Sequence, residues 1–464
     1  MDQYQVYSQK VYRLPKEYLE DLRLEVEFVF KSTHVKSLDQ VTFQMTTITS
    51  VEVYDGCLEA SRYSRAEQLA CLGIICFFTY IPMTVYDLES SKDEFQLLPD
   101  IRVKETIVPK LVINDDDETE DLQNLLGNME KDVDLTVTTL DRIRKGLFLE
   151  ESSYDANLHH DEVYMIYLGI VELLSDQFAN EMKTELEKSI AEKLKEFYIK
   201  SLFYEGNKLD EVVKRKSNLL NEVIVSDELG LKNKILFMCK KLDVNHLFLE
   251  DFVSNLIRIR NRVAHGRTIY TDKTIWPLPP FFYLIDDSSI KLDSVFNFMT
   301  CIVQRFFSLN RFDENFKEFK RSILPSKEYC KILLKNPDEC IFTKDELENG
   351  NAFNFTFETV FTLVVHTFSG VNIDEFANCI GKQFCDLEIT EYNGQIILNI
   401  SVLFAESKKD EVRIRAKENV EIIVRNQWYY WSNIKDLLRY LNYYNFEALW
   451  FEEWIKEKKY LQIR

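Results

Sequence analysis

The chain has 464 residues, of which 46% are hydrophobic, so it is long enough to bury a sizeable core and to form two or three domains. The formal net charge of -20 at pH 7 argues against a protein that coats nucleic acid or anionic membranes, but it leaves room for one local basic cleft. The low content of glycine (12) and proline (9) argues against disorder and against a loop-rich β architecture.

Cysteine usage and hydropathy bear on the compartment. The nine cysteines form no Cys-x-x-Cys pair, which predicts reduced structural thiols and no zinc site. The first residues lack the charged and apolar parts of a signal peptide, and the most apolar stretch, 69–81, is too short to cross a bilayer. We expect a cytoplasmic protein that does not contact a membrane. No glycine-rich phosphate loop or nucleotide fingerprint is present, so no cofactor is expected.

The first 150 residues are predicted to form a mixed α/β region that acts as a sensor or regulator. Residues 22–30 alternate between apolar and charged side chains, and 41–54 are rich in Thr, Val and Ile, so both predict strands. Residues 65–78 predict a helix that ends before Pro82. Residues 101–113 are expected to be extended.

An acidic run, 114–121, follows this region. It lacks the central glycine and the terminal glutamate of an EF-hand loop, so a solvated loop is favoured over a calcium site. We expect 114–153 to connect two domains.

Residues 155–320 are predicted to form an all-α bundle. Apolar side chains recur there at intervals of three and four residues. The expected helices are one from 161, one around 186–197, one beginning at Ser226, one from about 248 and one over 289–307.

Residues 321–464 are predicted to be α+β again. Asn393-Gly394 lies between two apolar runs, which is a strong hairpin signal. A second hairpin is expected from 412–416 and 420–424, and helices are expected from Ser432 onward. We also expect that the N- and C-terminal regions could form one unit.

The predicted helix from about 248 ends in a basic cluster, 256–267, which contains four arginines, one asparagine and one histidine but no acid. On a helix, Arg258 and Asn261 share a face with His265, because they precede it by seven and four residues. Arg260 lies further round, and Gly266 is suited to terminate the helix.

These side chains suit phosphodiester chemistry without a metal. A histidine can take up or release a proton near neutral pH. Guanidinium groups match phosphate oxygens and stabilise charge that develops on phosphorus. An RNA substrate would supply its own nucleophile, the 2′-hydroxyl.

The sequence Arg260-Asn261-Arg262-Val263-Ala264-His265 resembles the signature of the HEPN superfamily: an arginine, a polar residue, three further residues and a histidine. Arg258 fits the looser form of that motif. The resemblance covers about 161–307. It lacks the His-x-Tyr extension of some toxin pairs, since Gly266 and Arg267 follow the histidine.

The resemblance implies an α+β chain whose central all-α HEPN-like bundle is flanked by mixed α/β regions. It implies a metal-independent endoribonuclease that acts as a homodimer through the helical domain. By that likeness Arg260, Asn261 and His265 are catalytic, and Arg258, Arg262 and Arg267 bind RNA. Many relatives are toxin-like effectors of anti-phage abortive infection, whose flanking domains detect a phage-derived or other protein trigger.

Other interpretations stay open. The cluster could pair with acids and only help the domain to dimerise or to bind nucleotide or RNA, and a metal-dependent nuclease would need a carboxylate cluster that the sequence does not reveal. Four further stretches could bind a metal, bind RNA or stack on bases, and each also has a structural explanation: His159-His160, His366, Lys208–Lys216 and Trp428–Trp431.

Overall fold

A computed structural model describes most of the chain. The described residues are 3–18, 22–52, 57–84, 87–96, 107–114, 116–151, 159–265, 292–323, 325, 327–336, 341–350, 354–366, 373–431 and 433–458. The chain divides into two compact units, one made of 1–244, 256–270 and 291–316 and the other of 245–255, 271–290 and 317–464. None of the described helices is both long enough and apolar enough to cross a membrane.

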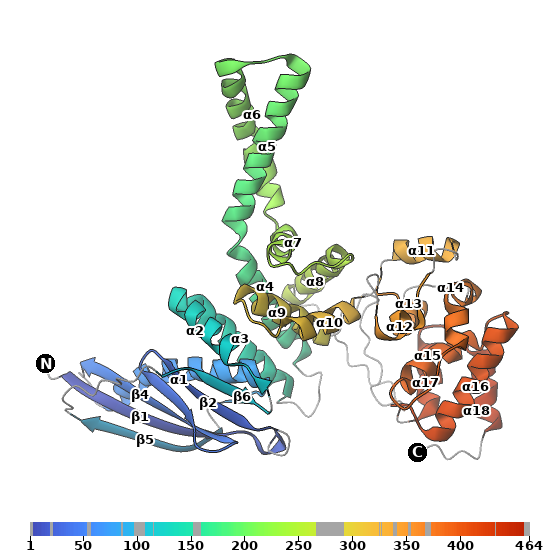
Figure 1. Cartoon of the computed structure of the whole chain (residues 1–464), viewed down its shortest axis with the longest axis horizontal. Helices are drawn as coiled ribbons and strands as arrows, with labels where there is room; N and C mark the ends of the chain where they lie inside the picture. The colour runs from blue at the N-terminus through green and yellow to red at the C-terminus, as the bar shows by residue number, and fades with distance from the viewer. Residues whose placement is uncertain are drawn as a thin grey trace. The chain divides into compact units, whose positions relative to one another are not determined.

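The first unit begins with an antiparallel sheet (Figure 1). Over the described residues it has seven strands in the order β5-β1-β4-β3-β2-β6-β7. The strands are β1 (Gln3–Arg13), β2 (Leu24–Phe30), β3 (Thr33–Ser37), β4 (Thr42–Glu52), β5 (Leu88–Gln96), β6 (Lys110–Ile113) and β7 (Asp116–Asp117), and a short 3-10 helix covers Lys16–Tyr18.

Helix α1 (Cys57–Thr79) packs on one face of this sheet. In β2 the side chains of Leu24, Val26 and Phe28 are buried and alternate with more exposed residues, so the predicted strand period is confirmed. The apolar run 70–78 of α1 is entirely buried, because α3 packs against this helix in addition to the sheet. Because this part of the helix is buried on several sides, apolar residues occupy all of its positions.

Helices α2 (Thr119–Lys131) and α3 (Val133–Glu151) continue the first unit, and α3 packs against both α1 and α4 (His160–Asp176). A Cβ atom at Gly73 of α1 would lie 3.2 Å from the Leu140 side chain, and one at Gly146 would collide with the Tyr167 ring. Small residues therefore let α3 approach both neighbours closely. The Tyr167 hydroxyl also donates to Glu150 at 2.8 Å.

Four further helices belong wholly to the first unit, and two cross the division between the units. The four are α5 (Ala179–Leu202), α6 (Gly206–Glu228), α7 (Leu231–Lys241) and α9 (Leu292–Phe306); the two are α8 (Leu249–Ala264) and α10 (Phe312–Ser322). The helices predicted from 161, around 186–197 and from about 248 are confirmed, and of the one predicted over 289–307 the structure describes α9 from Leu292 onward.

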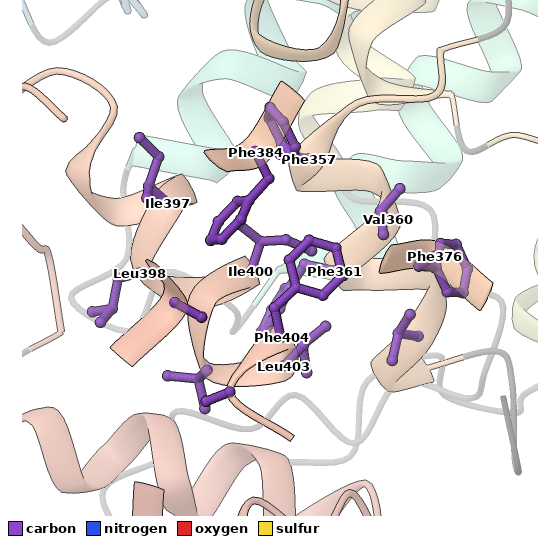
Figure 2. Packing of buried hydrophobic residues seen from close by; sticks show 14 of the residues in the cluster. Phe357, Val360, Phe361, Phe376, Phe384, Ile397, Leu398, Ile400, Leu403 and Phe404 are labelled. Atoms are coloured by element: carbon purple, nitrogen blue, oxygen red, sulfur yellow. The ribbon is translucent and has the colours of Figure 1, made fainter. Parts of the chain in front are cut away.

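Among its described residues the second unit contains helices and no strand. Its helices are α11 (Lys327–Lys335), α12 (Lys344–Asn349), α13 (Phe357–His366), α14 (Ile373–Cys385), α15 (Gly394–Phe404), α16 (Asp410–Asn426), α17 (Ile434–Tyr443) and α18 (Leu449–Glu457). Figure 2 shows its core, in which side chains of α13, α14 and α15 meet, among them Phe361, Phe384 and Phe404. The chain is therefore α+β, with an N-terminal sheet followed by a large helical region.

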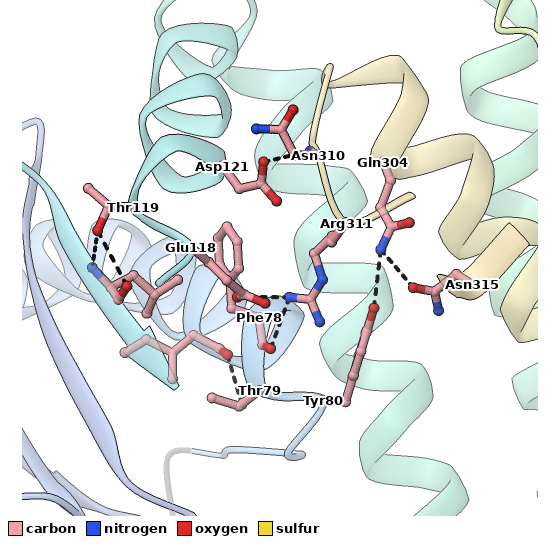
Figure 3. Close-up of polar contacts among 12 residues, drawn as sticks. Phe78, Thr79, Tyr80, Glu118, Thr119, Asp121, Gln304, Asn310, Arg311 and Asn315 are labelled. Carbon is pink, nitrogen blue, oxygen red and sulfur yellow. Dashed lines mark hydrogen bonds and ion pairs between the residues drawn. The ribbon is translucent and has the colours of Figure 1, made fainter. Parts of the chain in front are cut away.

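The prediction of a connecting region at 114–153 is wrong, because α2 and α3 occupy it. The acidic run is not wholly solvated either. Asp121 is buried and its carboxylate accepts the backbone N–H of Asn310 at 2.6 Å, while Glu118 pairs with Arg311 at 3.0 Å (Figure 3). The acidic side chains of this run thus bind partners far along the chain.

Two other boundaries differ from the prediction. Ser226 does not begin a helix but lies inside α6, and the next helix has Gly230 as its N-cap. Lys208–Lys216 also belongs to α6 and is not a loop. Within the expected extended stretch 101–113, residues 110–113 form β6, and 101–106 lie outside the described residues.

The hairpin prediction at Asn393-Gly394 is wrong, since these residues begin α15. The Asn393 side chain accepts the Thr390 N–H at 2.8 Å and donates to Glu348 at 2.9 Å. Gly394 is needed because a Cβ atom there would collide with the Trp428 backbone. The apolar run after it is buried on most sides of a helix, and such a run has no period that separates helix from strand.

The second predicted hairpin, 412–416 with 420–424, is also wrong, because both runs lie in α16. Its buried residues Val412, Ala416, Val420 and Ile423 recur every three or four positions. The β-branched composition outweighed this helical spacing in the prediction. The C-terminal region is therefore not α+β in its described part.

Candidate active site on helix α8

Helix α8 delivers the basic cluster to the surface of the first unit. Leu256 and Ile259 are buried, so they hold this part of the helix against its neighbours. The helix ends at Ala264, and the backbone N–H of His265 still donates to the Asn261 carbonyl at 3.1 Å. His265 therefore continues the helical spacing. Gly266 and Arg267 lie outside the described residues, so the predicted helix stop and the predicted RNA contact of Arg267 stay predictions.

Three of the candidate residues share an exposed side of α8. Arg258, Asn261 and His265 are all exposed, and they follow one another at three and four positions. Arg260 and Arg262 are half-buried. The helix therefore groups an arginine, an amide and an imidazole in the way that the spacing predicts, and all three groups are accessible to a ligand.

The half-buried Arg260 is anchored between two side chains. Its Nε donates to Glu172 Oε1 at 3.0 Å, and its Nη1 donates to Asn261 Oδ1 at 3.2 Å. A guanidinium has five N–H donors, and these two contacts engage two of them. Arg260 is thus oriented by protein contacts and retains donors that could meet a phosphate.

Glu172 of α4 is the residue of this site that the sequence reasoning missed. It is a single acid within the otherwise apolar stretch 163–174 of the α4 helix. A charge in such a position usually has a partner, and that signal could have singled it out. Its partner could not be named, because Glu172 and Arg260 are 88 residues apart in the chain.

A buried hydrogen bond fixes α4 against α8 just below the site. The Tyr164 hydroxyl donates to the Leu256 carbonyl at 3.1 Å. Burial raises the pKa of Tyr164 above its ordinary value, so the hydroxyl remains a donor at all physiological pH values. This bond, together with Glu172, keeps the polar end of α8 in register with α4.

The other histidine candidates have structural surroundings. His159 is the N-cap residue of α4, and the adjacent His160 is buried; burial lowers the pKa of His160, which Asp161 partly opposes. No group of three or more His, Cys, Asp or Glu side chains that could hold a metal ion occurs among the described residues. His366 ends α13, and its side chain is outside the described set.

The aromatic run Trp428–Trp431 lies between α16 and α17 in the second unit. Trp428, Tyr429 and Trp431 pack against the core of that unit, whereas Tyr430 is exposed. The Trp431 Nε1–H donates to Asn399 at 3.3 Å. Three of the four rings therefore serve packing, as the structural interpretation expected, although a helix stands where the hairpin was predicted.

Comparison with known proteins adds no relative. No model of a known protein family matches the sequence, and no curated protein and no solved structure is significantly similar to it.

Proposed function

We propose that the chain is a metal-independent endoribonuclease of the HEPN type, whose site is the exposed end of α8. One observation carries the proposal: Arg258, Asn261 and His265 share an accessible helix face beside Arg260, which Glu172 and Asn261 hold in place. This combination offers a titratable group and oriented cations at the same surface.

The chemistry assigned to these residues is cleavage by the RNA itself. The 2′-hydroxyl oxygen attacks the adjacent phosphorus, its proton passes to a base, and the bond to the 5′ oxygen breaks as that oxygen takes a proton from an acid. The products are a 2′,3′-cyclic phosphate and a 5′-hydroxyl end. His265 is the proton-transfer residue, Arg260 stabilises the charge on the phosphate oxygens, and Asn261 orients its neighbours.

One histidine at the site is sparse for both proton transfers. The proposal therefore includes a homodimer through the helical domain, in which a second copy of the site supplies the other group. Arg258, Arg262 and Arg267 would guide the RNA backbone, because guanidinium groups bind phosphates in two-pronged contacts.

The biological setting is proposed by likeness alone. The enzyme would act in the cytoplasm as a toxin-like effector of bacterial abortive infection, and the regions outside the central helices would restrain it until a phage-derived or other protein trigger arrives.

A second candidate function rests on the contact between Arg260 and Glu172. An arginine that is paired with an acid can be a structural residue, and then the helical domain would be a non-catalytic module for dimerisation or for binding nucleotide or RNA. The two functions differ in one property, which is whether RNA is cut.

The test is incubation of the purified chain with total RNA in the presence of a chelator. The wild type is expected to produce fragments with 2′,3′-cyclic phosphate ends, and His265→Ala and Arg260→Ala are expected to lose cleavage with their helical circular dichroism unchanged. The matched control is Arg425→Ala, which removes an exposed arginine from the last turn of a different helix, α16.

Cleavage that survives in both site variants would refute the proposal, and RNA binding without cleavage in the wild type would establish the second candidate. Mapping of cleavage sites after expression in cells then identifies the RNA that is cut.

A further inference from the structure

Helix α7 is a second basic element beside α4, in addition to the cluster on α8 (Figure 1). Its 11 residues, Leu231–Lys241, include four lysines and no acid, although the whole chain carries a net charge of -20. The cluster 256–267 likewise contains no acid. Two basic stretches without acids that contact the same helix concentrate positive charge locally, whatever the net charge of the chain.

Two acids of α4 bind one cation from each of these stretches. Glu172 accepts the Nε–H of Arg260 at 3.0 Å, and Asp176 forms an ion pair with the Nζ of Lys234. Glu172 and Asp176 are four residues apart, so they lie on the same side of α4 with their Cβ atoms about 6 Å apart. The guanidinium of Arg260 and the ammonium of Lys234 are therefore bound by neighbouring side chains, one helical turn apart.

The ion pair between Lys234 and Asp176 leaves the ammonium available to a further ligand. The Lys234 side chain is 20% exposed and that of Asp176 is 58% exposed, so the pair lies at the surface. Surface ion pairs contribute little to stability and exchange partners at low cost. An ammonium has three N–H donors, and the contact with Asp176 leaves others for a phosphate oxygen. A phosphate that reaches Arg260 therefore has a second cation close by.

We propose that Lys234 binds the phosphate of the RNA next to the one that is cut, while Arg260 contacts the cut phosphate itself. The inference rests on the proposed function, because it extends the same site along the RNA strand. Successive phosphates of a strand are one nucleotide apart, and two cations one helical turn apart can contact both. Such a contact fixes where the strand lies relative to the bond that breaks, and it carries no preference for a base.

The two acids of α4 have different parts in this arrangement. Glu172 is 26% exposed and orients Arg260, so it stays in place when RNA binds. Asp176 is the more exposed acid, and in the free protein its carboxylate occupies the position on Lys234 that the phosphate takes. The exchange of one anion for another leaves the ammonium paired throughout, which avoids the cost of an unpaired, largely buried charge.

Lys241 provides a matched control on the same helix. It lies seven residues after Lys234, which is two turns along α7 and on the same side. It also pairs with acids, Glu181 and Glu185, but these belong to α5 and not to α4. Replacement of either lysine by alanine removes one positive charge from an ion pair, and of the two, Lys234 is the one whose acid neighbours the acid of Arg260.

The first test is binding of a short single-stranded RNA, 2′-O-methylated throughout so that it has no nucleophile, to the full chain at several salt concentrations. Lys234→Ala is expected to reduce the slope of log affinity against log salt by about 0.7, the share of one phosphate on a single strand, and the affinity by about fivefold at about 0.1 M salt. Lys241→Ala should keep the wild-type slope. Alanine favours helices, so both variants should fold, and a purely structural lysine would change the urea midpoint but not the salt slope.

The second test separates binding from chemistry on RNA that can be cut. Lys234→Ala should raise KM by about fivefold and leave kcat unchanged, because the phosphate that it contacts does not react. Arg260→Ala should instead lower kcat, because its guanidinium contacts the reacting phosphate. Lys234→Arg keeps a cation with N–H donors for phosphate and should restore the wild-type KM.

Three results would overturn the proposal: equal salt slopes for Lys234→Ala and Lys241→Ala, a wild type that binds no RNA, and a Lys234→Ala variant that loses kcat at an unchanged KM. Failure of the ribonuclease activity is distinguishable from these. Binding whose salt slope depends on Lys234, in a chain that cuts no RNA, would refute the activity and retain Lys234 as a phosphate contact of an RNA-binding module. Cleavage by a wild type whose salt slope equals that of Lys234→Ala would support the activity and refute the contact.

Discussion

Two arginines of the first unit stand in opposite situations. Arg311 is enclosed: its Nη1 donates to the Phe78 carbonyl at 3.2 Å and to Glu118 at 3.0 Å, and its guanidinium lies over the Phe78 and Tyr80 rings (Figure 3). Arg260 has Glu172 and Asn261 beside it but stays close to the exposed face of α8.

The exposed fraction of the side chain distinguishes these two arginines, whereas the ion pair does not. Both residues pair with a carboxylate at 3.0 Å, so an ion pair alone decides nothing. Arg311 has 19% of its side chain exposed and Arg260 has 35%. The enclosed arginine joins the end of α1 to the acidic run before α2, whereas the half-buried Arg260 retains N–H donors that can meet a ligand.

Replacement of Arg311 should have the largest effect, and it should fall on stability. Arg311→Ala leaves the Glu118 carboxylate, itself only 18% exposed, without its cation, and we expect a loss of about 3 kcal/mol in the free energy of unfolding. Arg311→Lys keeps the charge without the forked geometry and should lose less. Urea denaturation of both variants measures this, and a loss below about 1 kcal/mol for the alanine variant would mean that Arg311 is not structural.

Replacement of Arg260 should show the reverse pattern. We expect Arg260→Ala to reduce RNA cleavage by about a hundredfold or more, because it removes a donor from the phosphate charge. The stability loss should stay at about 1 kcal/mol or less, because the pair with Glu172 is partly solvated. Initial cleavage rates and urea midpoints on the same samples give the two numbers, and a variant that loses stability but keeps its specific rate would contradict the assignment.

Sequence patterns were sufficient where a helix or strand is buried on one side only. The alternation in β2 and the apolar spacing in α8 predict these elements, and the spacing also places Arg258, Asn261 and His265 on one face. In each case the face toward solvent carries polar residues, so the alternation of apolar and polar residues along the sequence shows the period of the element.

The same patterns failed where tertiary contacts replace solvent. The run after Gly394 is buried on most sides and therefore lacks a period, and Asp121 is acidic yet buried against a backbone N–H of Asn310. Glu172 shows how far the site could be predicted from the sequence. Its apolar neighbours mark it as an unusual charge, but its pairing with Arg260 depends on how α4 and α8 pack.

Substitutions of Glu172 test whether its contact with Arg260 matters for cleavage. Glu172→Ala should reduce cleavage about tenfold, since Arg260 would lose the acceptor that orients its guanidinium. Glu172→Gln retains an oxygen acceptor for the Nε–H and should lose only about twofold to threefold. The ratio of the two rates is the measurement, and equal losses in both variants would show that the charge of Glu172, and not its position, is what matters.

Two histidines differ in exposure as the two arginines do, and here we expect the smallest effect. His265 is exposed, whereas His246 in the second unit is partly buried; its Nδ1 accepts the Phe248 N–H at 3.2 Å, and its Nε2 is buried without a hydrogen-bond partner among the described residues. Burial, assisted by repulsion from Lys320, lowers the pKa of His246 to about 4 from an ordinary value of 6.5.

Between these values the unfolded chain binds the additional proton, so stability should decrease as the pH falls from about 6.5 toward 4. His246→Phe removes that proton uptake, and its urea midpoint should depend less on pH than that of the wild type over this interval. Parallel pH dependences in the wild type and in His246→Phe would show that His246 does not titrate with unfolding.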